Sequence, residues 1–355
     1  MKALLINTTS IVAASLALGI STAANAQEST VQLTGEVSLG GTGFASDEAG
    51  EPDYLQDVWD QSGSFDVSFD IAAAAPEYGF GVFGHADLGA ESSMLGVESS
   101  GTDANDMNIT LQSASIGVSG GSSALMARVG PRVTELAYAG DLAVGGAGAT
   151  TKFLDEGDDS PSVFDSIEII YAHAQGPLSV SAAYEPESGK ISGAAGYDLV
   201  SMYGPGRING YAFEDTMNNY EDTVDAIRGY RVAGFINNGA IELGGSIAVE
   251  DIDFADAHAS GNEKSERFSY GLGAVLMVQD NLDISVDYEH TSTSIDDDDR
   301  VISTIFSFGA EISLGDTMSI GGHVKQFNNA PVDYLRETTD KKSGTEAGFD
   351  FSISF

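Results

Sequence analysis

The last eight residues of the chain, Gly348 to Phe355, read GFDFSISF and alternate strictly between two kinds of side chain. The residues of one parity are Phe349, Phe351, Ile353 and Phe355, all large and apolar. The residues between them are small or polar. Because successive side chains of a β-strand point to opposite faces, this segment predicts a strand with one apolar and one polar face.

Two architectures accommodate a strand that ends the chain on an aromatic ring. In a soluble β-sandwich or a secreted adhesin it is an edge strand, whose apolar edge then needs cover. In a transmembrane β-barrel it pairs with the first strand and places its last ring in the aromatic belt at the interface. The alternation recurs in sixteen segments, whereas open twisted sheets rarely exceed about ten strands. The count favours an all-β, antiparallel, closed membrane barrel.

The connections between the predicted strands are of two kinds. Tight Asn/Asp/Gly turns such as Asn237-Asn238-Gly239 follow even-numbered strands, and longer, often acidic loops follow odd-numbered ones. This asymmetry is typical of outer-membrane barrels. The predicted strands lie near 31–39, 65–71, 80–88, 104–118, 122–130, 163–175, 177–187, 189–199, 206–215, 223–237, 239–252, 265–278, 281–293, 299–313, 317–328 and 341–355.

The N-terminal residues have the pattern of a secretory signal peptide. Lys2 precedes an apolar run from Ile11 to Ile20, and Ala24-Asn25-Ala26 matches a cleavage site before Gln27. The alternative, a membrane anchor, requires about 20 apolar residues, more than this run provides. We therefore expect residues 1–26 to be removed on export and residues 27–355 to form the barrel.

The charge of the chain limits the kinds of partner that it can bind. With 15 Lys and Arg against 54 Asp and Glu, its formal net charge is -39. Nucleic acid needs a basic surface and is excluded as a partner. The absence of cysteine excludes disulfides and thiolate metal sites. The acidity fits a cation-attracting pore, a calcium-binding surface or adaptation to a saline habitat.

One connection is much longer than the others that separate the strands. Pro131–Pro161 follows the fifth predicted strand, lacks β alternation and contains an acidic run near its end. Structureless connections beyond about 12–15 residues are usually functional. The sequence therefore predicts a functional loop at this point.

The signal peptide, the sixteen alternating strands, the long loop after the fifth and the terminal GFDFSISF together resemble the trimeric general diffusion porins of Gram-negative bacteria, the alphaproteobacterial type above all. The resemblance implies a homotrimer in outer-membrane lipid, with a water-filled channel for passive diffusion of small hydrophilic solutes and ions. It implies no catalysis and no cofactor. It also implies that residues 131–161 fold inward as the third loop, and that the barrel-insertion machinery reads the C-terminal strand.

In this family, acids on the inward loop face bases on the pore wall. The acids of the long loop are therefore candidates for the constriction: Glu135, Asp141, Asp155, Glu156, Asp158 and Asp159. The cluster from Asp155 to Asp159 has a second interpretation, a solvated outer loop tip. It also has the carboxylates for calcium, as does Asp296–Asp299, although neither matches an EF-hand loop and simple electrostatic screening is the alternative.

Strand parity selects the candidates for the pore wall. Four bases lie opposite apolar neighbours and are expected to point inward: Arg128, Arg207, Arg231 and Lys325. A charged side chain facing lipid costs about 2–4 kcal/mol at mid-bilayer, which supports this assignment. Plain lumen or rim salt bridges are the alternative role. Arg228 instead shares the parity of Tyr230 and Val232, which are assigned to the outward face. It therefore extends its guanidinium to the membrane–water interface, lies at a contact between subunits, or shows that the assignment of the two faces is wrong.

The early strands depart from the family pattern, because they carry acids where relatives often carry bases. Their polar-face candidates are Asp66, Asp70, His85 and Asp87. The departure predicts a negative lumen and a preference for cations.

Two other functions remain as alternatives. The first is an adhesin or calcium-coated barrel with a plugged lumen. The second is a barrel hydrolase, although the sequence has neither an H-E-x-x-H nor a G-x-S-x-G motif. Such an enzyme would place a serine beside His173 or His323 on the outward face, and parity places His323 inward.

Overall fold

The computed structural model describes residues 30–46, 60–75, 80–93, 110–129, 167–186, 189–215, 224–254, 264–279, 281–295, 301–315, 317–331 and 341–355. The predicted signal peptide and the long loop at 131–161 lie outside these residues, so the predicted inward fold of that loop stays a prediction. Within the described ranges, no helix has the length and hydrophobicity needed to cross a membrane.

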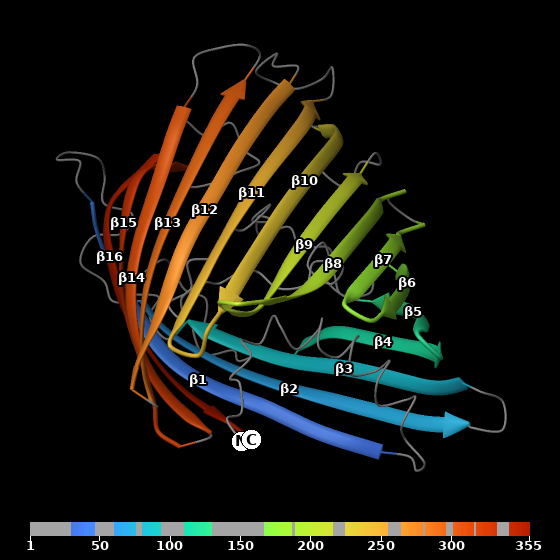
Figure 1. Ribbon diagram of the computed structural model, residues 1–355. Coiled ribbons are helices and arrows are strands. Elements are labelled where there is room, and N and C mark those ends of the chain that lie inside the picture. Colours follow the sequence, from blue (N-terminus) through green and yellow to red (C-terminus); the bar gives the residue numbers. More distant parts are fainter. Residues whose placement is uncertain are drawn as a thin grey trace, which may run out of the picture.

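The described residues form sixteen strands, which confirms the predicted number (Figure 1). Each pairs with its sequence neighbours in antiparallel orientation. The strands are β1 (Thr30–Ser46), β2 (Asp60–Ala75), β3 (Phe80–Ser93), β4 (Thr110–Gly120), β5 (Ser123–Val129), β6 (Ile167–Gln175), β7 (Leu178–Tyr184), β8 (Ile191–Ser201), β9 (Gly204–Asp215), β10 (Val224–Asn237), β11 (Ile241–Phe254), β12 (Lys264–Gln279), β13 (Leu282–Ile295), β14 (Val301–Ser313), β15 (Met318–Pro331) and β16 (Lys341–Ser354).

The terminal strand closes the barrel. β1 pairs with β2 on one side and with β16 on the other, with Leu39 opposite Phe351. The amide of Phe355 donates to the carbonyl of Gly35, and the amide of Gly35 donates to the carbonyl of Phe355, each at 2.9 Å. Closure leaves no strand edge unpaired, so the soluble sandwich is excluded.

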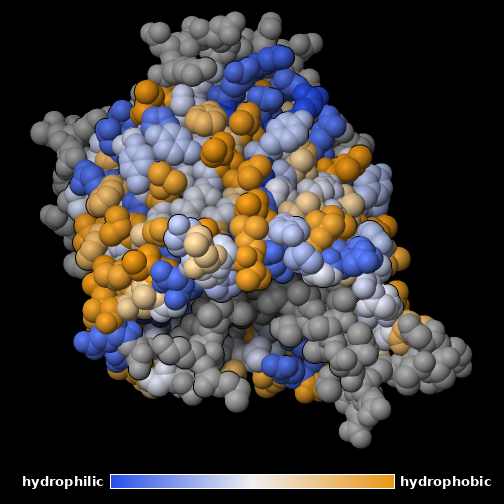
Figure 2. Space-filling model, in the orientation of Figure 1, coloured by the Kyte–Doolittle hydropathy of each residue, from blue (hydrophilic) through white to orange (hydrophobic). Residues whose placement is uncertain are grey.

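The wall is apolar outside and polar inside, the reverse of a soluble sandwich. Leu33 is 53% exposed and Phe349 is 53% exposed, both on the outward face, whereas Ser307 and Asn209 are buried on the inward face. Figure 2 shows orange hydrophobic side chains spread over the outward surface of the barrel. Lipid is the medium that satisfies such an outward surface.

Short turns join the strands at one end of the barrel. The predicted turn at Asn237-Asn238-Gly239 joins β10 to β11, and Gly239 has a φ of 84°, the left-handed region that glycine adopts without steric cost. The side-chain oxygen of Asn238 accepts hydrogen bonds from the amides of Ala240 and Ile241. The N-terminal part of β1 and the C-terminal end of β16, which pair at Gly35 and Phe355, lie at this same end of the barrel.

Candidate functional site

A compact polar cluster lies on the inner wall of β2, β3 and β4. Nδ1 of His85 is 2.8 Å from Oδ1 of Asp70, and Nε2 is 2.7 Å from Oδ2 of Asp87. The hydroxyls of Ser68 and Ser113 both donate to Asp87 at 2.6 Å. The side chain of His85 is 10% exposed. The cluster thus joins three of the four predicted early-strand residues.

The two contacts of His85 constrain its protonation state. A neutral imidazole has one N–H, so only the protonated ring donates to both carboxylates. In that form the ring offsets one of the two negative charges of Asp70 and Asp87. The fourth predicted residue, Asp66, pairs with Glu36 of β1 in the strand register and has the parity of Asp70; its side chain lies outside the described part.

The four predicted wall bases all lie on the inward face. Arg128 and Arg231 are 9% and 4% exposed. Nζ of Lys325 is 3.9 Å from Oε1 of Glu346 on β16. Lys325 is therefore in a lumenal ion pair, and Arg128 lies opposite Glu168 of β6.

Arg207 has the most completely defined contacts of the four. It donates to Asp198, Asn209 and Ser179, each at 2.7 Å. These partners hold it close to the short turn between β8 and β9, near one end of the barrel. The geometry is that of a rim salt bridge, which was the alternative role.

The structure adds inward charged residues that the candidate set omitted. Glu250 is 2% exposed, and Arg267, opposite it on β12, is almost as buried. Glu289 and Asp287 lie on the next strand, β13. Parity alone identifies them: Ile247 and Val249 face outward, so Glu250 faces inward. The sequence did not show which of these residues lie opposite one another, because that depends on the register between neighbouring strands.

Arg228 faces outward and is held by two acids. Its guanidinium donates to Glu214 of β9 and Asp253 of β11, each at 2.8 Å. All three lie near the ends of their strands away from the short turns. The assignment of inward and outward faces by parity is therefore right for β10. Arg228 lies in a group of ion pairs on the outward face, at the end of the barrel away from the short turns.

The six loop candidates lie outside the described residues, as do Asp296–Asp299. The loop candidates are Glu135, Asp141, Asp155, Glu156, Asp158 and Asp159. Among the side chains that the structure does describe, no group of three or more His, Asp or Glu has the spacing to hold a metal ion.

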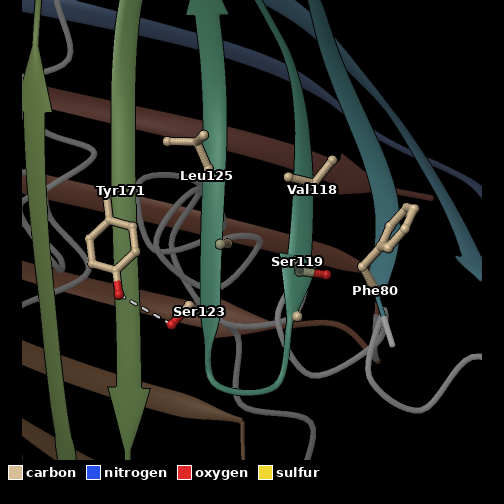
Figure 3. A pocket seen from close by; sticks show the side chains of 8 residues that line it. Phe80, Val118, Ser119, Ser123, Leu125 and Tyr171 are labelled. Carbon is tan, nitrogen blue, oxygen red and sulfur yellow. Dashed lines mark hydrogen bonds between the residues drawn. The ribbon is translucent and has the colours of Figure 1, made fainter. Parts of the chain in front are cut away.

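An apolar cavity of ≈ 440 Å³ lies on the wall at the short-turn end of β3 to β6 (Figure 3). Phe80, Val118, Leu125 and Tyr171 line it. At its edge Oγ of Ser123 is 3.2 Å from the hydroxyl of Tyr171 and 2.9 Å from Nδ1 of His173. This is the outward serine–histidine contact that the hydrolase alternative requires.

The comparison with protein families gave one match over most of the chain. A model described as Gram-negative porin matches residues 9–330. The matched region contains fourteen whole strands, β1 to β14, and ends within β15. No curated protein sequence matches the chain.

Solved structures share the fold at low sequence identity. The trimer form of OmpT, an outer membrane protein of Vibrio cholerae, has 14% identity and a TM-score of 0.64, covering 93% of this chain and 100% of that one. Salmonella typhi OmpF in complex with daunomycin has 11% identity and a TM-score of 0.64, with coverage of 92% and 97%. A refined porin structure has 16% identity and a TM-score of 0.59, with coverage of 92% and 100%.

Proposed function

The chain belongs to the Gram-negative porin family and forms a diffusion channel in the outer membrane, and we propose that this channel admits cations in preference to anions. Members of the family are channels and not enzymes. The contact between Ser123 and His173 is accordingly a structural hydrogen bond on the outward face, and the hydrolase alternative is set aside.

The observation that carries the cation preference is the excess of carboxylates among the described inward side chains. The inward bases are Arg128, Lys190, Arg207, Arg231, Arg267 and Lys325. The inward acids are Glu36, Asp70, Asp87, Glu168, Glu185, Asp198, Glu242, Glu250, Asp283, Asp287, Glu289, Glu311, Glu346 and Asp350. A lumen lined by one sign of charge concentrates the opposite ions and favours their passage.

We further propose that the channel is a homotrimer in outer-membrane lipid. The trimer form of Vibrio cholerae OmpT supports this, since that barrel covers nearly the whole of this chain. The insertion machinery is the proposed partner of the C-terminal strand, whose rings Phe349 and Phe355 are exposed on the outward face.

Diffusion through such a pore needs no resident cofactor. We propose that calcium acts as a screening counter-ion for the acidic segments 155–159 and 296–299. Magnesium at equal concentration should then shift the ion selectivity as much as calcium does, and a shift with calcium alone would instead indicate a defined calcium site.

The test is conductance of the purified, refolded protein in a planar bilayer with a KCl gradient. Stepwise openings in threes, with a reversal potential of cation-selective sign, are expected. Anion-selective openings would retain the channel but overturn the proposed preference. Folded, heat-modifiable protein that never conducts would favour the plugged barrel or adhesin.

A further inference from the structure

Glu250 is a buried carboxylate whose oxygens make no hydrogen bond. It lies on the inward face of β11 and is 2% exposed. Neither Oε1 nor Oε2 has a hydrogen-bond partner among the described residues. A buried acceptor without a donor is unfavourable, and more so when it is charged. Glu250 therefore presents acceptor atoms that a ligand bearing N–H groups would satisfy.

The nearest cation forms an ion pair with Glu250 but no hydrogen bond. Arg267 lies directly opposite on β12, and its Nη1 is 3.6 Å from Oε1 of Glu250, beyond hydrogen-bond distance. A pair built for stability would make close, hydrogen-bonded contacts, because those offset the cost of burying both charges. The ion pair therefore leaves both carboxylate oxygens of Glu250 without a hydrogen-bond donor.

The charges on four successive strands alternate in sign around Glu250. Arg231 on β10 is opposite Ala248, two residues from Glu250. On the far side of Arg267, Glu289 of β13 is opposite Gly271, which has no side chain to shield the carboxylate from β12. Glu289 is within electrostatic reach of both Arg231 and Arg267. The order across the inner wall is therefore base, acid, base, acid.

This alternation selects the charge of a bound solute. The two arginines repel a simple cation, and the two glutamates repel a simple anion. A solute with both an ammonium and a carboxylate group meets an opposite charge at each end. Its N–H groups donate to Glu250, and its carboxylate accepts from the guanidinium of Arg267, which forms paired hydrogen bonds with carboxylates.

We propose that Arg231, Glu250, Arg267 and Glu289 form a subsite for zwitterionic solutes, with small amino acids as the substrate class. The inference rests on the proposed channel function and adds the class of solute that the channel favours. The subsite raises the local concentration of amino acids at the inner wall, and the return of Glu250 and Arg267 to their own ion pair lets the amino acids leave again.

The test is the swelling of proteoliposomes in L-serine and in erythritol, an uncharged polyol of similar size. The wild-type channel should admit serine faster than erythritol. Glu250→Gln and Arg267→Gln should each lower the serine-to-erythritol ratio by about two- to fivefold, the range for one ion contact that replaces an existing ion pair. Glu266→Gln is the matched control, since Glu266 precedes Arg267 on β12 and is exposed on the outward face.

The outcomes separate this inference from the channel itself. Erythritol entry without a preference for serine would overturn the subsite and keep the channel. A ratio that falls in Glu250→Gln but rises in Arg267→Gln would mean a plain cation site and would also overturn it. No erythritol entry into vesicles that hold heat-modifiable protein would overturn the channel function first. Erythritol entry in each variant confirms that its barrel is folded and open.

Discussion

Asp283 on β13 lies directly opposite Glu311 on β14, so two carboxylates face each other across one strand pair on the inner wall. Like charges in directly opposed positions of a sheet are destabilising. The placement adds negative charge near the short-turn end of the lumen, where Ser319 donates a hydrogen bond to Glu311.

Neutralising one member of this pair should raise stability and lower selectivity together. Glu311→Gln is expected to increase the free energy of unfolding by about 0.2–1 kcal/mol, the range for cross-strand charge pairs. Urea titration in lipid vesicles measures this change, and the reversal potential should move toward zero in the same variant. A loss of stability would mean that the hydrogen bond from Ser319 to the charged Glu311 outweighs the repulsion from Asp283.

The cluster around His85 predicts opposite effects for neighbouring substitutions. His85→Ala removes the ring between Asp70 and Asp87 and should increase cation preference, because both carboxylates are then uncompensated. Asp70→Asn should decrease it. Reversal potentials under a KCl gradient measure both.

The paired variants control for disturbed folding, since a folding defect would move both potentials in one direction. His85→Ala should also reduce stability by about 1.5–3 kcal/mol, the range for a lost hydrogen bond to a charged group, while Asp87 keeps Ser68 and Ser113 as donors. Equal potentials in the wild type and both variants would remove this cluster from the conduction path.

The loop acids test the proposed constriction. Glu135→Gln and Asp141→Asn should each lower cation preference, since carboxylates at the narrowest point act most strongly on passing ions. Salt-gradient potentials are again the measurement, with outward-facing Glu266→Gln as the control. An unchanged selectivity would place both acids away from the constriction.

The terminal ring should matter for assembly more than for conduction. Phe355 is 58% exposed on the outward face, while its backbone pairs with Gly35. Phe355→Ala should therefore slow insertion by the cellular machinery and leave single-channel conductance unchanged. Phe306→Ala removes a ring of similar exposure on the outward face of β14 and should not slow insertion; equal delays in both variants would deny Phe355 a special role.

Much of this architecture follows from local patterns in the sequence. A period of two in side-chain polarity is a property of each segment alone, so the sixteen strands, their two faces and the inward direction of Arg128 and Arg231 were predictable. Even the outward position of Arg228 followed from its parity with Tyr230. Its two acidic partners did not, because they lie on other strands.

The sequence by itself determined which side chains face the lumen, because alternation requires no knowledge of neighbouring strands. The tertiary structure decided which of them meet. His85 lies between Asp70 and Asp87, and Glu250 lies opposite Arg267, only because each strand pair has one hydrogen-bond register. A shift of one residue along any pair would exchange every partner and both faces. The register, which closure of the whole barrel fixes, therefore decides which inward charges lie next to one another.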